Sequence, residues 1–190
     1  MKKKSLIIIV AIVAVIVVIV AALSGTYNSF VSKQEEVTAA QSAISTQLQR
    51  RADLIPNFVE TVKGYSDYEQ STYTAVTEAR SAVSKASSVE EQQAADDELN
   101  RAISIWVNAV TEAYPELKAN EQYIALTDEL AGTENRIAQA RKDYNAVAKE
   151  YNVSIKKFPK NILASVFGFD AADYFEASDS AEDVPQVSFE

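Results

Sequence analysis

Three charged side chains stand where helical spacing would place a buried face. Arg51, Glu69 and Arg80 each occupy a step in runs of mostly apolar residues that recur every three or four positions. One explanation is that they lie at the edge of the packed face and reach water along their methylene stems. The other is a polar core cluster with Glu69 between two guanidinium groups, which would set helix register or mark a site, since an unpaired buried ion costs stability. We favour the first explanation because it needs no special geometry.

The remaining side chains leave little for catalysis. The 190 residues include no cysteine and no histidine, so the commonest general base, the commonest metal ligand and thiolate nucleophiles are all missing. The four glycines form no phosphate-binding loop. Adjacent acids, as in the acidic run 96–98, point about 100° apart on a helix and do not converge on one atom. We predict no enzyme activity, no catalytic residues, no cofactor and no metal site. A hydrolase with a serine or aspartate nucleophile and a lysine base is the least favoured alternative.

Charge is distributed unevenly along the chain. The formal net charge is −9, and residues 161–190 contain seven acidic side chains but no lysine or arginine. Nucleic acid rewards clustered basic residues, so we expect no nucleic-acid partner. Residues 177–190 are predicted to be an acidic, disordered tail. Docking of this tail to a basic partner or to cations is the alternative.

Helices are the elements that would position these side chains. Apolar residues alternate by steps of about four and three in four stretches, at residues 37–55, 58–83, 99–117 and 126–151. Such seams let helices pack lengthwise at shallow angles, and the alternation typical of strands is nearly absent. The spacing predicts an all-α fold in which residues 25–160 form an antiparallel four-helix bundle.

Local signals mark the ends of these helices. Pro56 interrupts or kinks the first one, and Ser87 or Ser88 can cap a later one. Pro115 marks a second break. Pro159 ends the last helix, because the residue before a proline disfavours helical geometry.

The N-terminus is strongly apolar. Residues 6–23, from Leu6 to Leu23, are uninterrupted apolar positions behind Lys2, Lys3 and Lys4. At about 1.5 Å per residue they span roughly 27 Å, close to the hydrocarbon thickness of a bilayer. We predict a basic leader at 1–4 and a transmembrane helix at 5–24, with the lipid bilayer as its partner. A cleaved signal peptide is the alternative, although its apolar region would be shorter, at about 7–15 residues.

The basic residues also indicate an orientation. The three lysines precede the span, and the first basic residue after it is Lys33. The positive-inside rule then keeps the N-terminus in the cytoplasm and exports the C-terminal domain. The expected location is the cell membrane, with a single pass.

Residues 161–176 form an apolar segment after the bundle. Its large apolar side chains are Ile162, Leu163, Val166, Phe167, Phe169 and Phe175. We predict that this segment caps the open end of the bundle. An interfacial or partner-binding segment is the alternative, although interfacial helices usually carry Lys or Arg.

Several motifs resemble the LemA family. They are RRADLIPN at 50–57, EAR at 78–80, YPELKAN at 114–120 and TENRIAQAR at 133–141 with YN at 144–145. The resemblance runs from the N-terminal span to about Glu176 and implies a bacterial membrane protein with one N-terminal span and an antiparallel helical bundle. No catalytic residues are established for the family, so none is carried over. Family descriptions often place the short N-terminus outside the cell, opposite to the orientation derived from the lysines, which we retain.

These features predict a non-enzymatic, membrane-anchored scaffold or interaction module whose partner is another membrane or envelope protein. The resemblance adds envelope homeostasis or association with a membrane protease as its setting. The alternative is a sensor of a small ligand or envelope signal. In that reading, aromatic residues such as Trp106 and Tyr144, with Asn145 and Asn152 on one helix face, line a groove. Core packing is the simpler role for the aromatic stripe.

Overall fold

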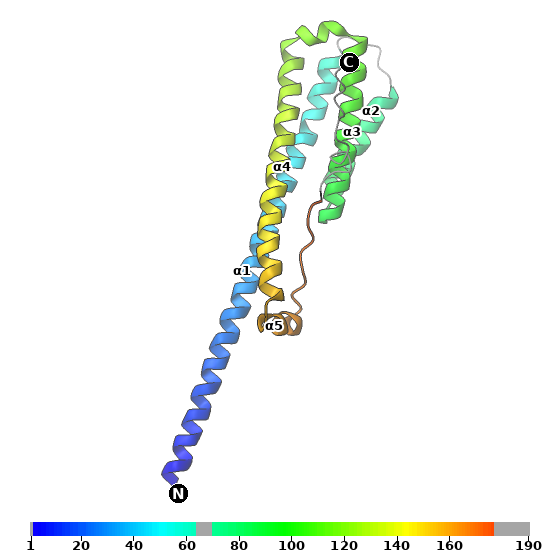
Figure 1. The fold of residues 1–190 in the computed structure, drawn as a ribbon. Coiled ribbons are helices and arrows are strands. Elements are labelled where there is room, and N and C mark those ends of the chain that lie inside the picture. Colours follow the sequence, from blue (N-terminus) through cyan, green and yellow to red (C-terminus); the bar gives the residue numbers. More distant parts are fainter. Residues whose placement is uncertain (1, 64–69, 177–190) are drawn as a thin grey trace, which may run out of the picture. The chain divides into compact units, whose positions relative to one another are not determined.

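The computed structural model describes residues 2–63 and 70–176, and the side chains of residues 6–62 and 74–176. Within that part of the chain every regular element is a helix, which confirms the all-α prediction (Figure 1). The elements are α1 (Lys2–Lys63), α2 (Gln70–Lys85), α3 (Val89–Ala113), the 3-10 turn η1 (Pro115–Ala119), α4 (Glu121–Lys156) and α5 (Lys160–Phe167). The tail predicted over residues 177–190 lies outside the described residues.

The chain forms two compact units, to which α1 and α4 both contribute. The first unit comprises Met1–Ala39 and Ala146–Asp173, and the second comprises Ala40–Asn145 and Tyr174–Glu190.

The second unit is an antiparallel four-helix bundle of α2, α3 and the adjoining parts of α1 and α4 (Figure 1). Along α1, Arg51 lies near Glu134 of α4, whereas Phe58 lies against the earlier residue Tyr123, so these two helices run in opposite directions. Helices α2 and α3 are joined by a short connection and pack on each other. The predicted four-helix architecture is therefore confirmed, whereas the bounds of 25–160 given to the bundle stay a prediction.

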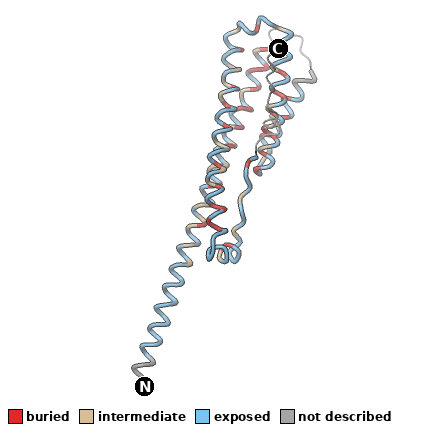
Figure 2. The backbone as a smooth tube through the Cα atoms, in the orientation of Figure 1, coloured by how far each residue is buried: buried red, intermediate tan, exposed pale blue. Residues whose placement is uncertain are grey.

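An apolar core holds the second unit together. The ring of Phe58 lies 4.7 Å from that of Trp106 and 5.2 Å from that of Tyr123, and all three side chains are buried. Figure 2 shows buried positions recurring along the helices, as expected when every third or fourth residue faces a neighbour.

Several predicted helix ends coincide with observed ones. Ser88 caps α3 by accepting a hydrogen bond from the backbone N–H of Glu91 at 3.1 Å, and the Glu91 carboxylate accepts one from the Ser88 N–H at 3.1 Å. This reciprocal pair is a capping box. Helix α3 ends just before Pro115, and α4 ends before Pro159. Pro56, in contrast, lies inside α1 and does not end it.

The apolar run at 58–83, predicted as one helix, is divided between two. Phe58 and Val62 belong to the last turns of α1, whereas Val76 and Val83 belong to α2. The apolar rhythm resumes in α2 because both helices bury a face in the same core.

In the first unit, α4 runs back along α1. The Nζ of Lys33 on α1 lies 3.2 Å from a carboxylate oxygen of Glu150 on α4. Farther toward the start of α1, the ring of Tyr27 lies 5.2 Å from that of Phe167, the last residue of α5. Phe167 and Phe169 of the predicted apolar segment 161–176 thus lie against α1 within this unit. Phe175 belongs to the second unit, where its ring lies 5.2 Å from that of Tyr144. Capping of the open end of the bundle by the whole segment stays a prediction.

A glycine ends α5. Gly168 has a φ of 73°, a left-handed conformation that glycine adopts without steric cost. The N–H of Phe169 donates to the carbonyl of Ala164 at 2.9 Å, as in a Schellman motif. The turn brings the ring of Phe169 to 5.2 Å from that of Phe30 on α1.

Candidate functional site

A buried ionic cluster joins three helices of the second unit. Asp96 of α3 accepts a hydrogen bond from Nη1 of Arg51 on α1 at 3.3 Å and from Nη2 of Arg141 on α4 at 2.8 Å. The side chains of Arg51 and Asp96 are each 3% exposed, and that of Arg141 is 13% exposed. Two guanidinium groups share one carboxylate away from water, so these three side chains carry an excess positive charge.

Burial dominates the electrostatics of this cluster. Loss of water lowers the pKa of Arg51 and raises the pKa of Asp96, while their mutual attraction acts in the opposite direction. Desolvation outweighs attraction here, as it often does for buried ion pairs. Arg141 gains a further contact, because its Cζ lies 5.2 Å from the centre of the Phe175 ring in a cation–π arrangement.

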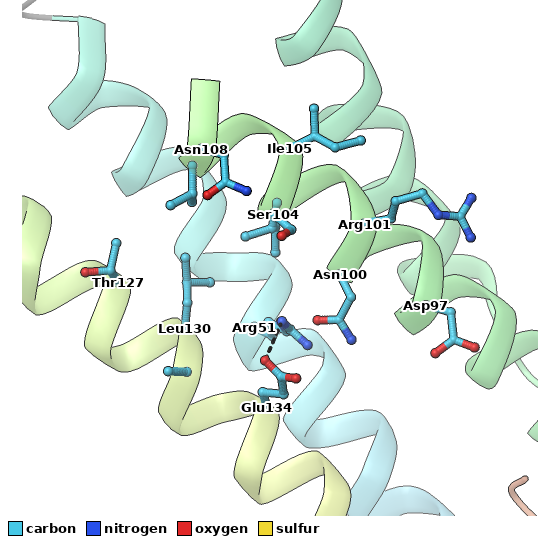
Figure 3. Close-up of a pocket in the computed structure, with 13 residues that line it drawn as sticks. Arg51, Asp97, Asn100, Arg101, Ser104, Ile105, Asn108, Thr127, Leu130 and Glu134 are labelled. Atoms are coloured by element: carbon cyan, nitrogen blue, oxygen red, sulfur yellow. Dashed lines mark ion pairs between the residues drawn. The ribbon is translucent and has the colours of Figure 1, made fainter. Parts of the chain in front are cut away.

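Arg51 also lines a groove of about 670 Å³ in the second unit, bordered by α3 and α4 (Figure 3). Asn100, Ser104 and Asn108 project from α3 at intervals of four residues, so they share one helix face. Across from them, Glu134 of α4 reaches toward Arg51. Their closest charged atoms are 3.7 Å apart, and the Glu134 side chain is 64% exposed.

The guanidinium of Arg51 is incompletely satisfied. Its buried Nε has no hydrogen-bond partner within the described part of the chain. Its link to Glu134 is long for a charge-assisted hydrogen bond, which is normally about 2.7–2.9 Å. The groove therefore places the loosely paired Arg51 beside a row of amide and hydroxyl groups, and a guanidinium in this position can pair with a small anionic ligand. Arg101, Asp97 and Glu134 also line the groove, so its charges are of both signs.

The predicted polar core cluster is distributed differently in the structure. Arg80 is 41% exposed and lies 3.7 Å from Asp53, so it reaches water as the first explanation expected. That explanation is wrong for Arg51, whose side chain is buried with Asp96. Glu69 lies outside the described residues.

Asp96 and Arg141 are not among the residues predicted for the polar core cluster. Asp96 stands in the acidic run 96–98, yet it lies one three-residue step before Leu99 and so extends the apolar seam of α3. Arg141 follows Ile137 by four residues and precedes Tyr144 by three, which is again a seam position. Extending each seam through its charged residues would have located both.

Asn145 and Asn152 are engaged by the chain itself. In the first unit, Asn152 donates to the carbonyl of Ala172 and accepts from its N–H, both at 2.8 Å. In the second unit, Asn145 makes the same pair with Phe175, at 2.8 and 3.0 Å. We call each of these pairs an asparagine clasp. Neither asparagine, nor the buried Trp106 and Tyr144, lines the groove of Figure 3.

The predicted span, from Leu6 to Leu23, lies within α1. Its large apolar side chains from Leu6 to Val20 are 51–68% exposed. Among the described residues, one helix is long and apolar enough to cross a membrane, and none of its most apolar stretch is buried. Length and composition alone make it a candidate membrane anchor.

Comparison with known proteins places these helices in a family. The sequence is 29% identical over 194 residues to magnetosome protein MamQ 2 of Paramagnetospirillum magneticum, a match that covers 88% of this chain and 71% of that protein. It is 27% identical over 190 residues to magnetosome protein MamQ of Magnetospirillum gryphiswaldense, covering 85% and 70%. It is 27% identical over 158 residues to protein LemA of Metamycoplasma hominis, covering 82% and 71%. The model of the LemA family matches residues 40–189, which hold the whole ionic cluster and both clasps, and the chain therefore belongs to the LemA family.

Proposed function

We propose that this chain is a membrane-anchored, non-enzymatic scaffold or interaction module. The exposed apolar stretch of α1 carries the proposal, because its side chains find no cover within the described part of the chain. Removing such surface from water is favourable by roughly 25 cal/mol per Å² of apolar area. The helices that follow offer long packed surfaces, and the sequence contains no histidine or cysteine, which supports a role in interaction.

The proposal also covers the cellular process in which the chain works and the side of the membrane on which its helical domain lies. The names of two relatives refer to a magnetosome and not to a reaction, in keeping with a non-catalytic role. The resemblance to the LemA family suggests work in envelope homeostasis or beside a membrane protease, with another membrane or envelope protein as the partner. The lysines at positions 2–4 favour a helical domain outside the cytoplasm.

Alkaline extraction of membranes tests the anchor, because it releases peripheral proteins and retains spanning ones. We expect the full chain to stay in the pellet with a mass that includes residues 1–24. A variant carrying Ile12→Arg and Ile16→Arg should be released, since each charge at the centre of a span costs about 2.5–3.5 kcal/mol. Release of the unchanged chain, or a mature mass lacking residues 1–24, would overturn the proposal.

Exchange of the span tests the role of tethering. One variant replaces residues 6–23 with an unrelated apolar span, and another replaces residues 1–24 with a cleavable signal peptide. Crosslinking in cells should recover the same membrane partner with the native and the unrelated span, and lose it with the released domain. Equal recovery from all three would show that tethering is unnecessary.

The groove of Figure 3 favours a second candidate function, the binding of a small anionic ligand. An anion could replace the exposed Glu134 as the partner of Arg51 and pair with it in two-pronged geometry. Thermal unfolding of the full chain against a panel of carboxylates and phosphates tests this function. A stabilising ligand should lose its effect in Arg51→Gln and keep it in the control Arg80→Gln, and a panel without stabilising members would count against a sensor.

A further inference from the structure

The exposed side of α5 is strongly apolar. Phe158, Ile162 and Val166 are 80%, 55% and 72% exposed, and they are spaced by four residues. Ile162 and Val166 therefore share one face of α5, and Phe158 precedes that face in the turn between α4 and α5. The opposite side of α5 is in contact with the protein, since Ala164 is buried and Phe167 meets Tyr27 of α1.

Contacts within the first unit fix the level of α5 along α1. Tyr27, which touches Phe167, follows Leu23 by four residues, so it lies about 6 Å beyond the end of the apolar run at the helical rise of 1.5 Å per residue. Glu150 of α4 pairs with Lys33 of α1, and α4 then continues toward the start of α1. The six residues from Glu150 to Lys156 cover about 9 Å, so α4 ends at about the level of Tyr27. The polar interface on each side of a bilayer is roughly 5–7 Å thick. Helix α5 thus lies where a bilayer spanned by α1 would place its headgroups.

The basic residues around α5 are also those expected of a helix at the level of the lipid headgroups. Lys156, Lys157 and Lys160 are exposed at the end of α4, in the following turn and at the start of α5. Between Glu150 and Asp170 the chain has these three basic residues and no acidic one. Basic side chains beside an apolar helix face are typical of helices that lie in a membrane interface, where they meet lipid phosphates.

We propose that α5, together with Phe158, is an interfacial helix that inserts its apolar face into the leaflet from which α1 emerges. The lysines bind lipid phosphates, and Phe158, Ile162 and Val166 enter the boundary between headgroups and acyl chains. The inference rests on the proposed spanning role of α1. It gives the chain a second membrane contact, which sets the tilt and rotation of α1 as an interfacial anchor does.

Single-cysteine variants of the full chain test this inference, because the natural sequence has no cysteine. An environment-sensitive fluorophore is attached at Ile162→Cys or Val166→Cys in vesicles of phosphatidylcholine and phosphatidylglycerol. Glu36→Cys, exposed on α1 and about 20 Å beyond Leu23, serves as the aqueous control. Val15→Cys reports on the span itself.

We expect blue-shifted emission at residues 162 and 166, with strong quenching by lipids that carry a nitroxide near the headgroup and little quenching by iodide. The probe at residue 36 should show the reverse pattern. Replacing Lys156, Lys157 and Lys160 with glutamine should raise iodide quenching at residue 166. This rise should be larger in vesicles with phosphatidylglycerol than in phosphatidylcholine alone, since the lysines would no longer hold anionic headgroups.

Two results would overturn the inference and leave the anchor intact. Iodide quenching at residues 162 and 166 equal to that at residue 36, with Val15→Cys still in lipid, would place α5 in water. Protection of residues 162 and 166 from both quenchers would mean that protein, such as a second copy of this chain, covers the face. If the probe at residue 15 is itself in water, the proposed anchor fails together with the inference.

Discussion

Arg51 and Arg141 both donate to the carboxylate of Asp96. Each oxygen of Asp96 accepts from a different arginine, at 3.3 and 2.8 Å. A buried group of this kind adds little net stability, because desolvation offsets attraction, yet it is costly to break from one side. It links α1, α3 and α4 and so favours one register of the bundle over its alternatives.

This reasoning predicts opposite outcomes for one and two substitutions. Asp96→Leu leaves Arg51 buried without its acceptor and should destabilise the second unit by about 3–5 kcal/mol. Adding Arg51→Met should restore part of that loss, because it removes the more deeply buried of the two guanidinium groups left without the carboxylate, while Arg141, 13% exposed, remains. Urea unfolding followed by fluorescence of Trp106, the only tryptophan and a buried residue of this unit, measures both. The exposed Asp128→Asn is the control, and equal stability of the single and double variants would contradict the argument.

The capping box predicts a pH dependence. Hydrogen bonds from the backbone N–H groups of Ser87 and Ser88, and from the Ser87 hydroxyl, hold the pKa of Glu91 below its ordinary value of 4.5. A carboxyl with a lowered folded pKa stabilises the fold above its unfolded pKa, and this contribution is lost as the pH falls through the folded value. Glu91→Ala should therefore lower the melting temperature at pH 7 and have no effect at a pH below the folded value.

Ser88→Ala provides the matched comparison. It removes the N-cap acceptor of α3, at a cost of about 0.5–2 kcal/mol. Serine does not titrate in this range, so the cost of losing its acceptor should persist at acidic pH. Thermal melts of the three chains between pH 3 and 7, followed by Trp106 fluorescence, separate the two effects. If the lowering of the melting temperature by Glu91→Ala is as large at pH 3 as at pH 7, the stabilising role given to the ionised Glu91 carboxylate is wrong.

The positions of the helices follow from the spacing of apolar residues, and several helix ends follow from capping residues and prolines. Ser88 and Pro115 bound α3 as expected, since caps and prolines act on residues next to them. The run at 58–83 could not be divided in advance, because residues of two helices that face one core keep the same rhythm. The asparagine clasps left no spacing signal, since each amide meets backbone atoms 20 or 30 residues away.

The clasps predict local effects on hydrogen exchange. Asn152→Ala removes both hydrogen bonds to Ala172, each worth about 0.5–1.5 kcal/mol, so exchange of the Ala172 amide should accelerate by about tenfold or more. Amides in the middle of α3, in the second unit, should be unaffected. Asn152→Asp keeps the acceptor for the Ala172 N–H and should show a smaller change. Unaltered exchange at Ala172 in the alanine variant would show that other contacts hold this segment.

For the whole molecule, sidedness decides which partners the helical domain can meet. If the lysines at positions 2–4 keep the N-terminus in the cytoplasm, a membrane-impermeant maleimide should label Glu36→Cys in intact cells. Replacing the three lysines with glutamate removes the basic bias and should reduce the labelled fraction. Labelling of residue 36 only after lysis would reverse the orientation.

The clasp at Asn152 has a consequence for how this chain can change over time. The side-chain amide of Asn152 bonds only to the backbone C=O and N–H of residue 172 and not to its side chain. Substitutions at position 172 therefore keep both hydrogen bonds to Asn152, so a different residue there in a related protein would not mean that this contact is lost. Proline is the exception, because it has no N–H to offer.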